Sequence, residues 1–279
     1  MMSLSYAGLS KSPRVFLRLV GLSVNDFDLI LKKVLPLWEE RVIGSYKRPG
    51  RHFKLEVSDM LLMLCIYYRS YITHAFLGYL FGLDDSRICR IFRKIEPLVA
   101  GVVHITKDKK LTKEEVANIL IDVTEQAIER PKKNQKKHYS GKKKRHTLKT
   151  ELRTTHEGRI VNVSRSYPGS KHDFAIHRDG PPVDRDSRVF VDSGYQGLDK
   201  LHKKTELPYK ATKKMLLNKE QKIYNRLLSK IRIKIENVIG QIKQFRILSD
   251  RYRNKRSNYN LRFNIIAGLV NIKNGFSIA

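Results

Sequence analysis

The sequence lacks the features of a secreted or membrane-embedded protein. It has only two cysteines, Cys65 and Cys89, neither of them in a CxxC pair, which excludes a disulfide framework and disfavours a zinc site. The N-terminal residues have no continuous apolar stretch of the kind found in signal peptides. The longest apolar run, residues 60–68, is too short to span a bilayer. These absences predict a cytoplasmic protein with no membrane partner.

Acidic residues are also scarce. The chain has 27 Asp and Glu against 56 Lys and Arg, which gives a formal net charge of +29. A chain with this excess repels itself unless it meets a polyanion, and nucleic acid is the favoured one. An anionic membrane surface is a weaker alternative, because no basic amphipathic anchor or lipidation signal is present. With 41% hydrophobic residues, the composition is that of a globular protein.

The hydrophobic pattern divides the 279 residues into two parts. Residues 1–100 carry apolar side chains at helical spacing, which predicts an all-α domain. Residues 101–117 include the charged patch KDKKLTKEE and are expected to link the domains. Residues 118–279 alternate strand-like and helical segments, which predicts an α/β domain that the last helix, residues 261–272, packs shut.

A helix-turn-helix is predicted within the first domain. A short helix, AFLGYLFG, ends at Gly82, and a second helix begins near Asp84 and is expected to stop near Pro97. Arg87 and Arg90 lie on the polar side of this second helix, where they are candidates for contact with DNA. The alternative is an ordinary basic helical hairpin within a core.

Three acids in the second domain stand at related positions. Three apolar residues precede Asp122 in residues 118–124, and three precede Asp192 in residues 188–197, so each acid is expected at the end of a buried strand. The third, Glu236, lies in residues 227–246, whose apolar residues have helical spacing. Arg232, Glu236 and Lys243 are four and seven residues apart and share one face of that helix.

Three carboxylates from separate elements can hold hard divalent cations such as Mg²⁺. Two such ions can stabilise the attacking and the leaving oxygen of an in-line phosphoryl displacement. The alternative is that each acid is ordinary: an aspartate after a strand commonly belongs to a turn, and a glutamate between Arg and Lys commonly forms an exposed ion pair.

Several segments carry a resemblance to a known family. They are IDVTEQ at 121–126, YSGKKKRHTLK at 139–149, YPGSKHD at 167–173, VDSGYQG at 191–197 and RIKIENVIGQIKQFRIL at 232–248. The chain resembles bacterial DDE transposases of the insertion-sequence-five type, which are related to the Harbinger-like transposases. The resemblance implies an RNase H-like α/β catalytic domain with a mixed sheet, preceded by an all-α helix-turn-helix domain. Its catalytic acids would be Asp122, Asp192 and Glu236.

The resemblance also assigns accessory residues. Arg232 and Lys243 match a Tyr-Arg-Glu-Lys signature and would contact phosphate or steady Glu236. The tyrosine of this signature is absent, because residue 229 is Ser, and Tyr224 is a candidate substitute. His172 and Asp173 would order the site, although Asp173 could equally be a helix N-cap.

A basic run covers residues 132–144 and continues to Arg145. Within it, Lys142, Lys143, Lys144 and Arg145 are candidate contacts for DNA. The alternative is a solvated loop in which no single residue is required.

The function that the resemblance implies is transposition. Water attacks a phosphodiester at a transposon end, and the freed 3′-hydroxyl attacks target DNA, with two Mg²⁺ or Mn²⁺ ions as cofactors. The partners would be the inverted-repeat ends and target DNA, bound by a homodimer or a higher oligomer at the bacterial nucleoid. Two alternatives remain: an inactive or domesticated DNA-binding protein, and an RNase H-like nuclease that cuts without joining.

Overall fold

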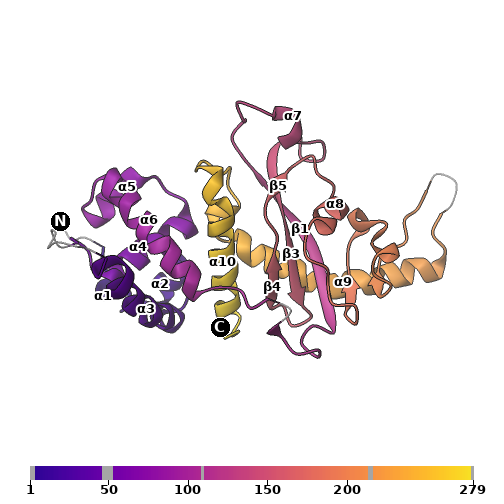
Figure 1. The fold of residues 1–279 in the computed structure, drawn as a ribbon, viewed down its shortest axis with the longest axis horizontal. Helices are drawn as coiled ribbons and strands as arrows, with labels where there is room; N and C mark the ends of the chain where they lie inside the picture. Colours follow the sequence, from indigo (N-terminus) through magenta and orange to yellow (C-terminus); the bar gives the residue numbers. More distant parts are fainter. Residues whose placement is uncertain (1–3, 46–52, 108–109, 213–215, 278–279) are drawn as a thin grey trace. The chain divides into compact units, whose positions relative to one another are not determined.

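A computed structural model describes residues 4–45, 53–107, 110–212 and 216–277 (Figure 1). The chain forms two compact units. The first unit contains the residues up to His104, together with Ile242–Asp250 and the residues from Asn254 onward; the second contains Ile105–Gln241 and Arg251–Arg253. This division differs from the expected one, because the C-terminal residues join the first unit.

The first unit is helical. Its elements are α1 (Tyr6–Leu9), α2 (Pro13–Val20), α3 (Val24–Trp38), the π-helical turn η1 (Glu39–Ile43), α4 (Val57–Ser70), α5 (His74–Phe81), α6 (Asp85–Val102), η5 (Arg246–Leu248), η6 (Arg256–Asn258) and α10 (Tyr259–Lys273). Helix α4 forms the centre of the core, since nearly every side chain from Met60 to Tyr68 is buried.

The expected helix-turn-helix is present in α5 and α6. Thr73 caps α5 by accepting the backbone N–H of Phe76, and Gly82 ends the helix at φ +64°, a conformation that favours glycine. Asp84 caps α6 by accepting the N–H of Arg87.

Helix α6 runs beyond the expected stop near Pro97 and ends at Val102. Pro97 has no N–H for the intrahelical hydrogen bond, and its ring disfavours a helix interior, so the helix continues only because other contacts offset this cost. Leu98, Val99 and Val102 are buried, and their packing sustains the last turn.

Helix α10 packs inside the first unit, whereas the sequence placed it with the second domain. A Cβ on Gly268 would lie 1.8 Å from the carbonyl oxygen of Val103, so only glycine allows this approach. Nearby, Arg262 Nε donates to the buried carboxylate of Glu96 at 2.8 Å, and Tyr68 donates to the same oxygen at 3.0 Å. These contacts hold α10 against α6 and α4.

The second unit is built on a mixed sheet of seven described strands, in the order β2-β3-β1-β6-β7, with β4 and β5 also paired to β3. Strands β1 and β3 are antiparallel, whereas β1, β6 and β7 are parallel neighbours. The strands are β1 (Asn118–Ala127), β2 (Tyr139–Ser140), β3 (Arg145–Thr155), β4 (Ile160–Val163), β5 (Tyr167–Pro168), β6 (Arg188–Phe190) and β7 (Thr205–Glu206). The helical first unit and this mixed sheet confirm the expected fold class, and β3 and β4 form a hairpin.

The described helices and helical turns of this unit are α7 (Gln135–His138), α8 (Asp173–Arg178), η3 (Ser193–Tyr195), η4 (Leu198–Lys200) and α9 (Lys219–Lys243). All but α7 contribute to the packing on the two faces of the sheet. On one face, Ile119 and Ile121 pack with Tyr195 and Leu198. On the other face, Leu120 and Phe190 pack against Leu228 and Ile235 of α9.

Helix α9 begins earlier than the sequence predicted and ends slightly earlier too. Asn218 and Gln221 form a reciprocal cap, in which each side chain accepts the backbone N–H of the other residue. This cap places the first turn at Lys219, eight residues before the expected start at Leu227. Among the described helices, none is both long and apolar enough to cross a bilayer.

Candidate active site

Asp122 stands in the middle of β1, not at its end as expected. Strand β1 continues to Ala127 because its antiparallel pairing with β3 extends to that residue. The parallel neighbour β6, however, pairs with β1 only as far as Leu120. The Asp122 side chain is thus free of a parallel neighbour, and it shares the face of Leu120 that packs toward α9.

Arg232 joins two of the predicted acids. Its guanidinium lies 3.4 Å from Asp122 Oδ2 and 3.9 Å from Glu236 Oε1. The Arg232 and Asp122 side chains are 14% and 20% exposed, whereas Glu236 is 54% exposed. Neighbouring Ile235 is fully buried against the sheet, and this packing holds Arg232 over β1.

Asp192 follows β6 and caps the turn η3. Its Oδ1 accepts the backbone N–H of Gly194 at 2.8 Å. A Cβ on Gly194 would lie 3.0 Å from this Oδ1 and 2.8 Å from Oδ2 of Asp173. The carboxylates of Asp192 and Asp173 therefore converge on a glycine that leaves no room for a side chain.

The acids interact electrostatically. Burial raises the pKa of Asp122 from 3.8 to about 6, while Arg232 and the Val123 N–H oppose the shift. The negative charges of Asp192 and Glu236 raise this pKa further. The two other predicted catalytic acids thus both lie within electrostatic reach of Asp122.

The donor set suits a hard divalent cation, since carboxylate oxygens are the ligands that Mg²⁺ prefers. Within the described residues, however, no three Asp, Glu, His or Cys side chains already form a metal-binding group. The guanidinium of Arg232 lies between Asp122 and Glu236. An ion shared by these two acids therefore requires Arg232 to withdraw.

Asp173 begins α8, but it is not the N-cap. That position belongs to His172, whose exposed side chain makes no capping hydrogen bond. The carboxylate of Asp173 instead accepts Lys149 Nζ at 3.0 Å, and the same ammonium donates to the carbonyl of Lys171 at 2.9 Å. Asp173 is therefore tied to strand β3 beside Asp192.

The remaining signature residues lie along α9. Lys243 is exposed in the last turn of the helix. Ser229 is exposed. Tyr224, the candidate substitute for the missing tyrosine, donates its hydroxyl to Glu206 and stands about 18 Å before Glu236 along the axis.

The candidate DNA-binding residues of the first unit are exposed at the start of α6. Arg87 pairs with the capping Asp84 at 3.0 Å, and Arg90 donates to Ser86 Oγ at 3.2 Å. Both arginines line a cavity of about 420 Å³ together with Lys54.

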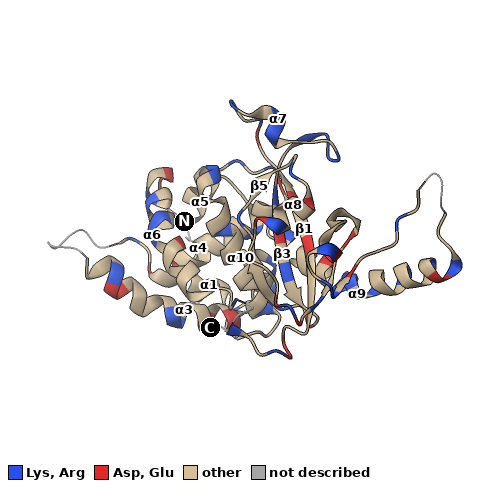
Figure 2. Ribbon diagram, turned by 45° about the vertical axis from the view of Figure 1, so that its right-hand side comes forward, with Lys and Arg blue, Asp and Glu red and all other residues tan. Residues whose placement is uncertain are grey.

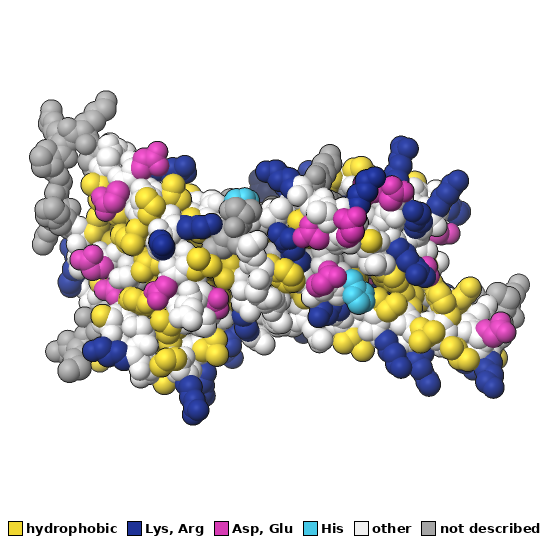
Figure 3. Space-filling view, turned by 90° about the horizontal axis from the view of Figure 1, so that it is seen from below, with side chains coloured by type: hydrophobic (Ala, Val, Ile, Leu, Met, Phe, Trp, Pro, Cys, Tyr) yellow, Lys and Arg dark blue, Asp and Glu magenta, His cyan; other side chains and the backbone are white. Residues whose placement is uncertain are grey.

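The basic run of the second unit has a defined conformation. Residues 135–138 form α7, Tyr139 and Ser140 pair with the start of β3, and residues 142–144 make the exposed turn between these strands. The hydroxyl of Ser140 accepts the N–H of Lys143 and braces this turn. Lys and Arg lie along this segment in Figure 2, and Figure 3 shows Lys and Arg side chains on the surface of both units.

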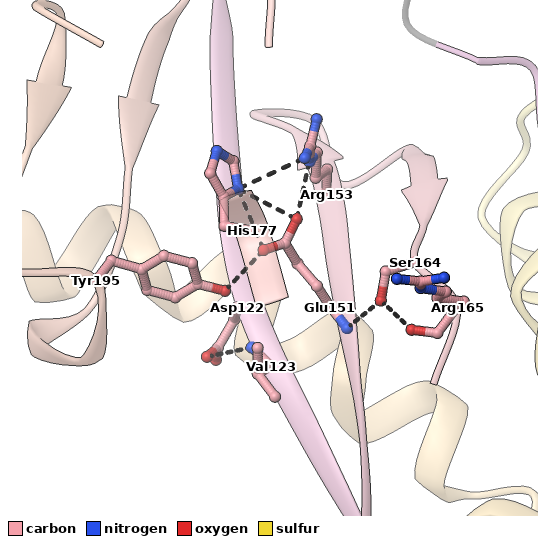
Figure 4. A network of polar contacts seen from close by, with 8 residues as sticks. All are labelled: Asp122, Val123, Glu151, Arg153, Ser164, Arg165, His177 and Tyr195. Carbon is pink, nitrogen blue, oxygen red and sulfur yellow. Dashed lines mark hydrogen bonds and ion pairs between the residues drawn. The ribbon is translucent and has the colours of Figure 1, made fainter. Parts of the chain in front are cut away.

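A buried polar network, which the sequence did not predict, lies on the sheet face opposite Asp122 (Figure 4). Glu151 and Arg153 are 2% and 1% exposed, and Arg153 Nε lies 3.0 Å from Glu151 Oε1. His177 Nδ1 lies 3.2 Å from both carboxylate oxygens, and the hydroxyl of Tyr195 donates to Oε2 at 3.4 Å. Burial, followed by the surrounding carboxylates, raises the pKa of Tyr195 well above its ordinary value, which keeps its hydroxyl a donor.

One sequence signal could have revealed this network. Glu151 and Arg153 have opposite charges two residues apart in a strand whose other residues are mostly apolar or Thr. Such residues point to the same side of a strand and can pair there. The pattern does not reveal that His177 and Tyr195 meet them.

Comparison with known proteins adds independent findings. Residues 121–271 match the family described as DDE superfamily endonuclease, and residues 53–103 match the helix-turn-helix of DDE superfamily endonuclease. A protein of Microchaete diplosiphon, described as "Probable transposase for insertion sequence element IS702", is 38% identical over 263 residues. That match covers 92% of this chain and 94% of the relative. No solved structure matches the chain.

Proposed function

Because the chain belongs to the DDE superfamily endonucleases and carries their helix-turn-helix, we propose that it cuts DNA at transposon ends and joins the freed ends to target DNA. The similarity to a probable transposase over most of both chains supports this proposal. The observation that carries it is the arrangement of Asp122, Asp192 and Glu236. Three separate elements direct these acids toward one region of the sheet, where their charges interact.

In this proposal Asp122, Asp192 and Glu236 hold two divalent ions, Mg²⁺ or Mn²⁺. When bound, such ions stabilise the attacking and leaving oxygens of an in-line phosphodiester displacement. Arg232 leaves its position between two of the acids and contacts the phosphate backbone, since a guanidinium binds phosphate as well as carboxylate. Asp173 and Lys149 orient the turn that carries Asp192.

In this proposal, different basic residues contact the bases and the phosphates of DNA. Arg87 and Arg90, at the start of the second helix of the helix-turn-helix, reach base edges of the transposon end. The turn of residues 142–145, and Lys243, contact phosphates and supply affinity that does not depend on sequence. Bringing two ends together requires at least two copies of the chain, so we propose a homodimer or a higher oligomer on DNA.

The test is cleavage and strand transfer on terminal inverted-repeat DNA with Mg²⁺ or Mn²⁺. Asp192→Asn and Glu236→Gln are expected to abolish cleavage, because each removes an ion ligand, and to leave binding to end DNA largely intact. Cleavage is read on labelled ends, and binding is read by electrophoretic mobility shift.

Each alternative outcome of this test indicates a different function for the chain. Cleavage without joining indicates a nuclease that does not transfer strands. Binding without cleavage, unaffected by Asp122→Asn, indicates an inactive DNA-binding protein and overturns the proposal. Variants that lose end binding together with cleavage would mean that these acids are structural.

A further inference from the structure

Glu151 occupies an unusual place for a carboxylate. It is 2% exposed in the middle of β3, and its backbone pairs opposite Val123, the residue after Asp122. Cross-strand neighbours share a face, so Glu151 lies behind the sheet while Asp122 points forward toward α9. A buried charge is stabilised only when it is paired and fully hydrogen-bonded, which makes its partners informative.

The first partner ties α8 to β3. His177 Nδ1 donates to the carboxylate of Glu151, with both oxygens at 3.2 Å. Asp173 is four residues earlier and so lies on the same side of α8, where it meets Lys149, two residues before Glu151 in β3. Helix α8 is therefore docked on the strand by two parallel polar contacts.

The second partner ties down the turn that carries Asp192. Tyr195 ends this turn, is fully buried, and donates its hydroxyl to Oε2 of Glu151 at 3.4 Å. The same turn begins at Asp192, whose carboxylate caps it. A shift of Tyr195 would therefore move Asp192 as well.

The third partner balances the charge. Arg153 Nε donates to Oε1 of Glu151 at 3.0 Å, and both side chains are excluded from water. Two carboxylate oxygens thus receive three donors from a strand, a helix and a turn. A glutamine has one acceptor oxygen and a donor amide, so it would place a donor against at least one of these groups.

We propose that Glu151 is a positioning residue, which through one buried carboxylate fixes the turn that carries Asp192, and α8 beside it, to β3, the strand paired with the one that carries Asp122. This inference rests on the proposed function, in which those acids hold the metal ions. Glu151 touches neither ion nor DNA; it sets the distances between the residues that do. Outer partners of this kind commonly change metal affinity by about 10–100-fold when they are replaced.

The test measures Mn²⁺ affinity of the full chain by calorimetry without DNA, beside thermal unfolding in EDTA. Glu151→Gln is expected to weaken Mn²⁺ binding by about 10–100-fold, and Tyr195→Phe, which releases only one element, by about tenfold. The matched control is Glu96→Gln. Glu96 is also a buried carboxylate that accepts from an arginine and a tyrosine, Arg262 and Tyr68, but it lies in the helical unit.

Glu96→Gln is expected to lower the melting temperature and to leave Mn²⁺ affinity within about twofold of wild type. If Glu151→Gln lowers the melting temperature equally but binds Mn²⁺ like wild type, the positioning role is overturned. Should Glu151→Gln fail to fold, unchanged Mn²⁺ affinity of Tyr195→Phe overturns it. A wild-type chain that binds Mn²⁺ but cleaves no end DNA contradicts the proposed function alone, and one that binds no Mn²⁺ contradicts both.

Discussion

At the scale of single residues, Asp122 is an acid whose surroundings disfavour the charged form of its carboxyl group. It is the acid that burial affects most clearly, and its pKa rises to about 6 although Arg232 stands beside it. A carboxylate held in this way favours any cation that arrives, whether a proton or a metal ion. The residue is therefore suited to binding a ligand and poorly suited to stabilising the fold.

The first prediction concerns the stability of Asp122→Asn. The folded pKa of about 6 exceeds the unfolded value of 3.8, so the folded state binds the proton more tightly, and the stability that this proton supplies is lost as pH rises from about 4 to about 6. Asparagine removes the charge and keeps the Oδ1 that accepts the Val123 N–H. In EDTA the variant should be more stable than wild type by roughly 2 kcal/mol at about pH 8 and equal to it at about pH 4.

Urea unfolding at the two pH values measures this difference. Asp199→Asn, which alters an exposed acid, is the control and should change stability little at either pH. A gain of the same size at both pH values would show that the effect does not come from titration of Asp122.

At the scale of elements, α9 combines packing and chemistry. Leu228 and Ile235 bury one side of the helix against the sheet, and this packing places Arg232 and Glu236 at the edge of that buried side. The Asn218–Gln221 cap sets where the helix starts. Because this packing fixes α9 on the sheet, Arg232 and Glu236 keep a fixed position relative to β1.

The turn of residues 142–145 is a second element, which we propose contacts DNA phosphates. The prediction for this turn concerns how DNA affinity depends on salt concentration. Replacing its four cations with Gln should reduce the slope of log affinity against log salt by about 2–4 for random-sequence DNA, because fewer counterions are released. Fluorescence anisotropy at several salt concentrations measures this slope.

The control removes the same charge from elsewhere in the chain. It replaces four exposed cations of the N-terminal segment: Lys11 between α1 and α2, Lys32 and Lys33 in α3, and Arg41 in η1. An equal loss of slope in this control would mean that only net charge matters and that the turn makes no local contact with phosphate.

At the scale of the whole molecule, the residues proposed to read DNA and the acids proposed to cleave it lie in different compact units. The helical unit carries the exposed arginines of α6, and it is fastened internally by the buried contacts of Glu96 with Arg262 and Tyr68. The sheet unit carries the acids. Each unit has its own core, so changes in one should leave the local chemistry of the other intact.

The corresponding prediction is for Arg87→Ala and Arg90→Ala. Each should reduce the preference for end DNA over random DNA by about 5–150-fold, since one base contact contributes about 1–3 kcal/mol of discrimination. Mn²⁺ affinity without DNA should not change. Competition binding with both DNAs measures the preference, and a uniform loss of affinity for both would indicate phosphate contact instead of base reading.

Much of this organisation could be predicted from local signals in the sequence. The helix-turn-helix followed from Gly82 and Asp84, because caps and left-handed glycines act over a few residues. The apolar stripe of α9 followed from periodicity. The excess of Lys and Arg indicated a polyanionic partner before any element was placed.

Only the tertiary structure decided how distant residues meet. It places Asp122 inside a strand, because β3 pairs with β1 beyond the point where β6 ends. It joins α10 to the helical unit through Gly268 and Arg262. It also gathers His177 and Tyr195 around Glu151, since burying a carboxylate requires partners that the chain supplies from far apart. The sequence alone determined which residue types could hold metal and DNA, and the packing of the sheet against α8 and α9 determined their arrangement.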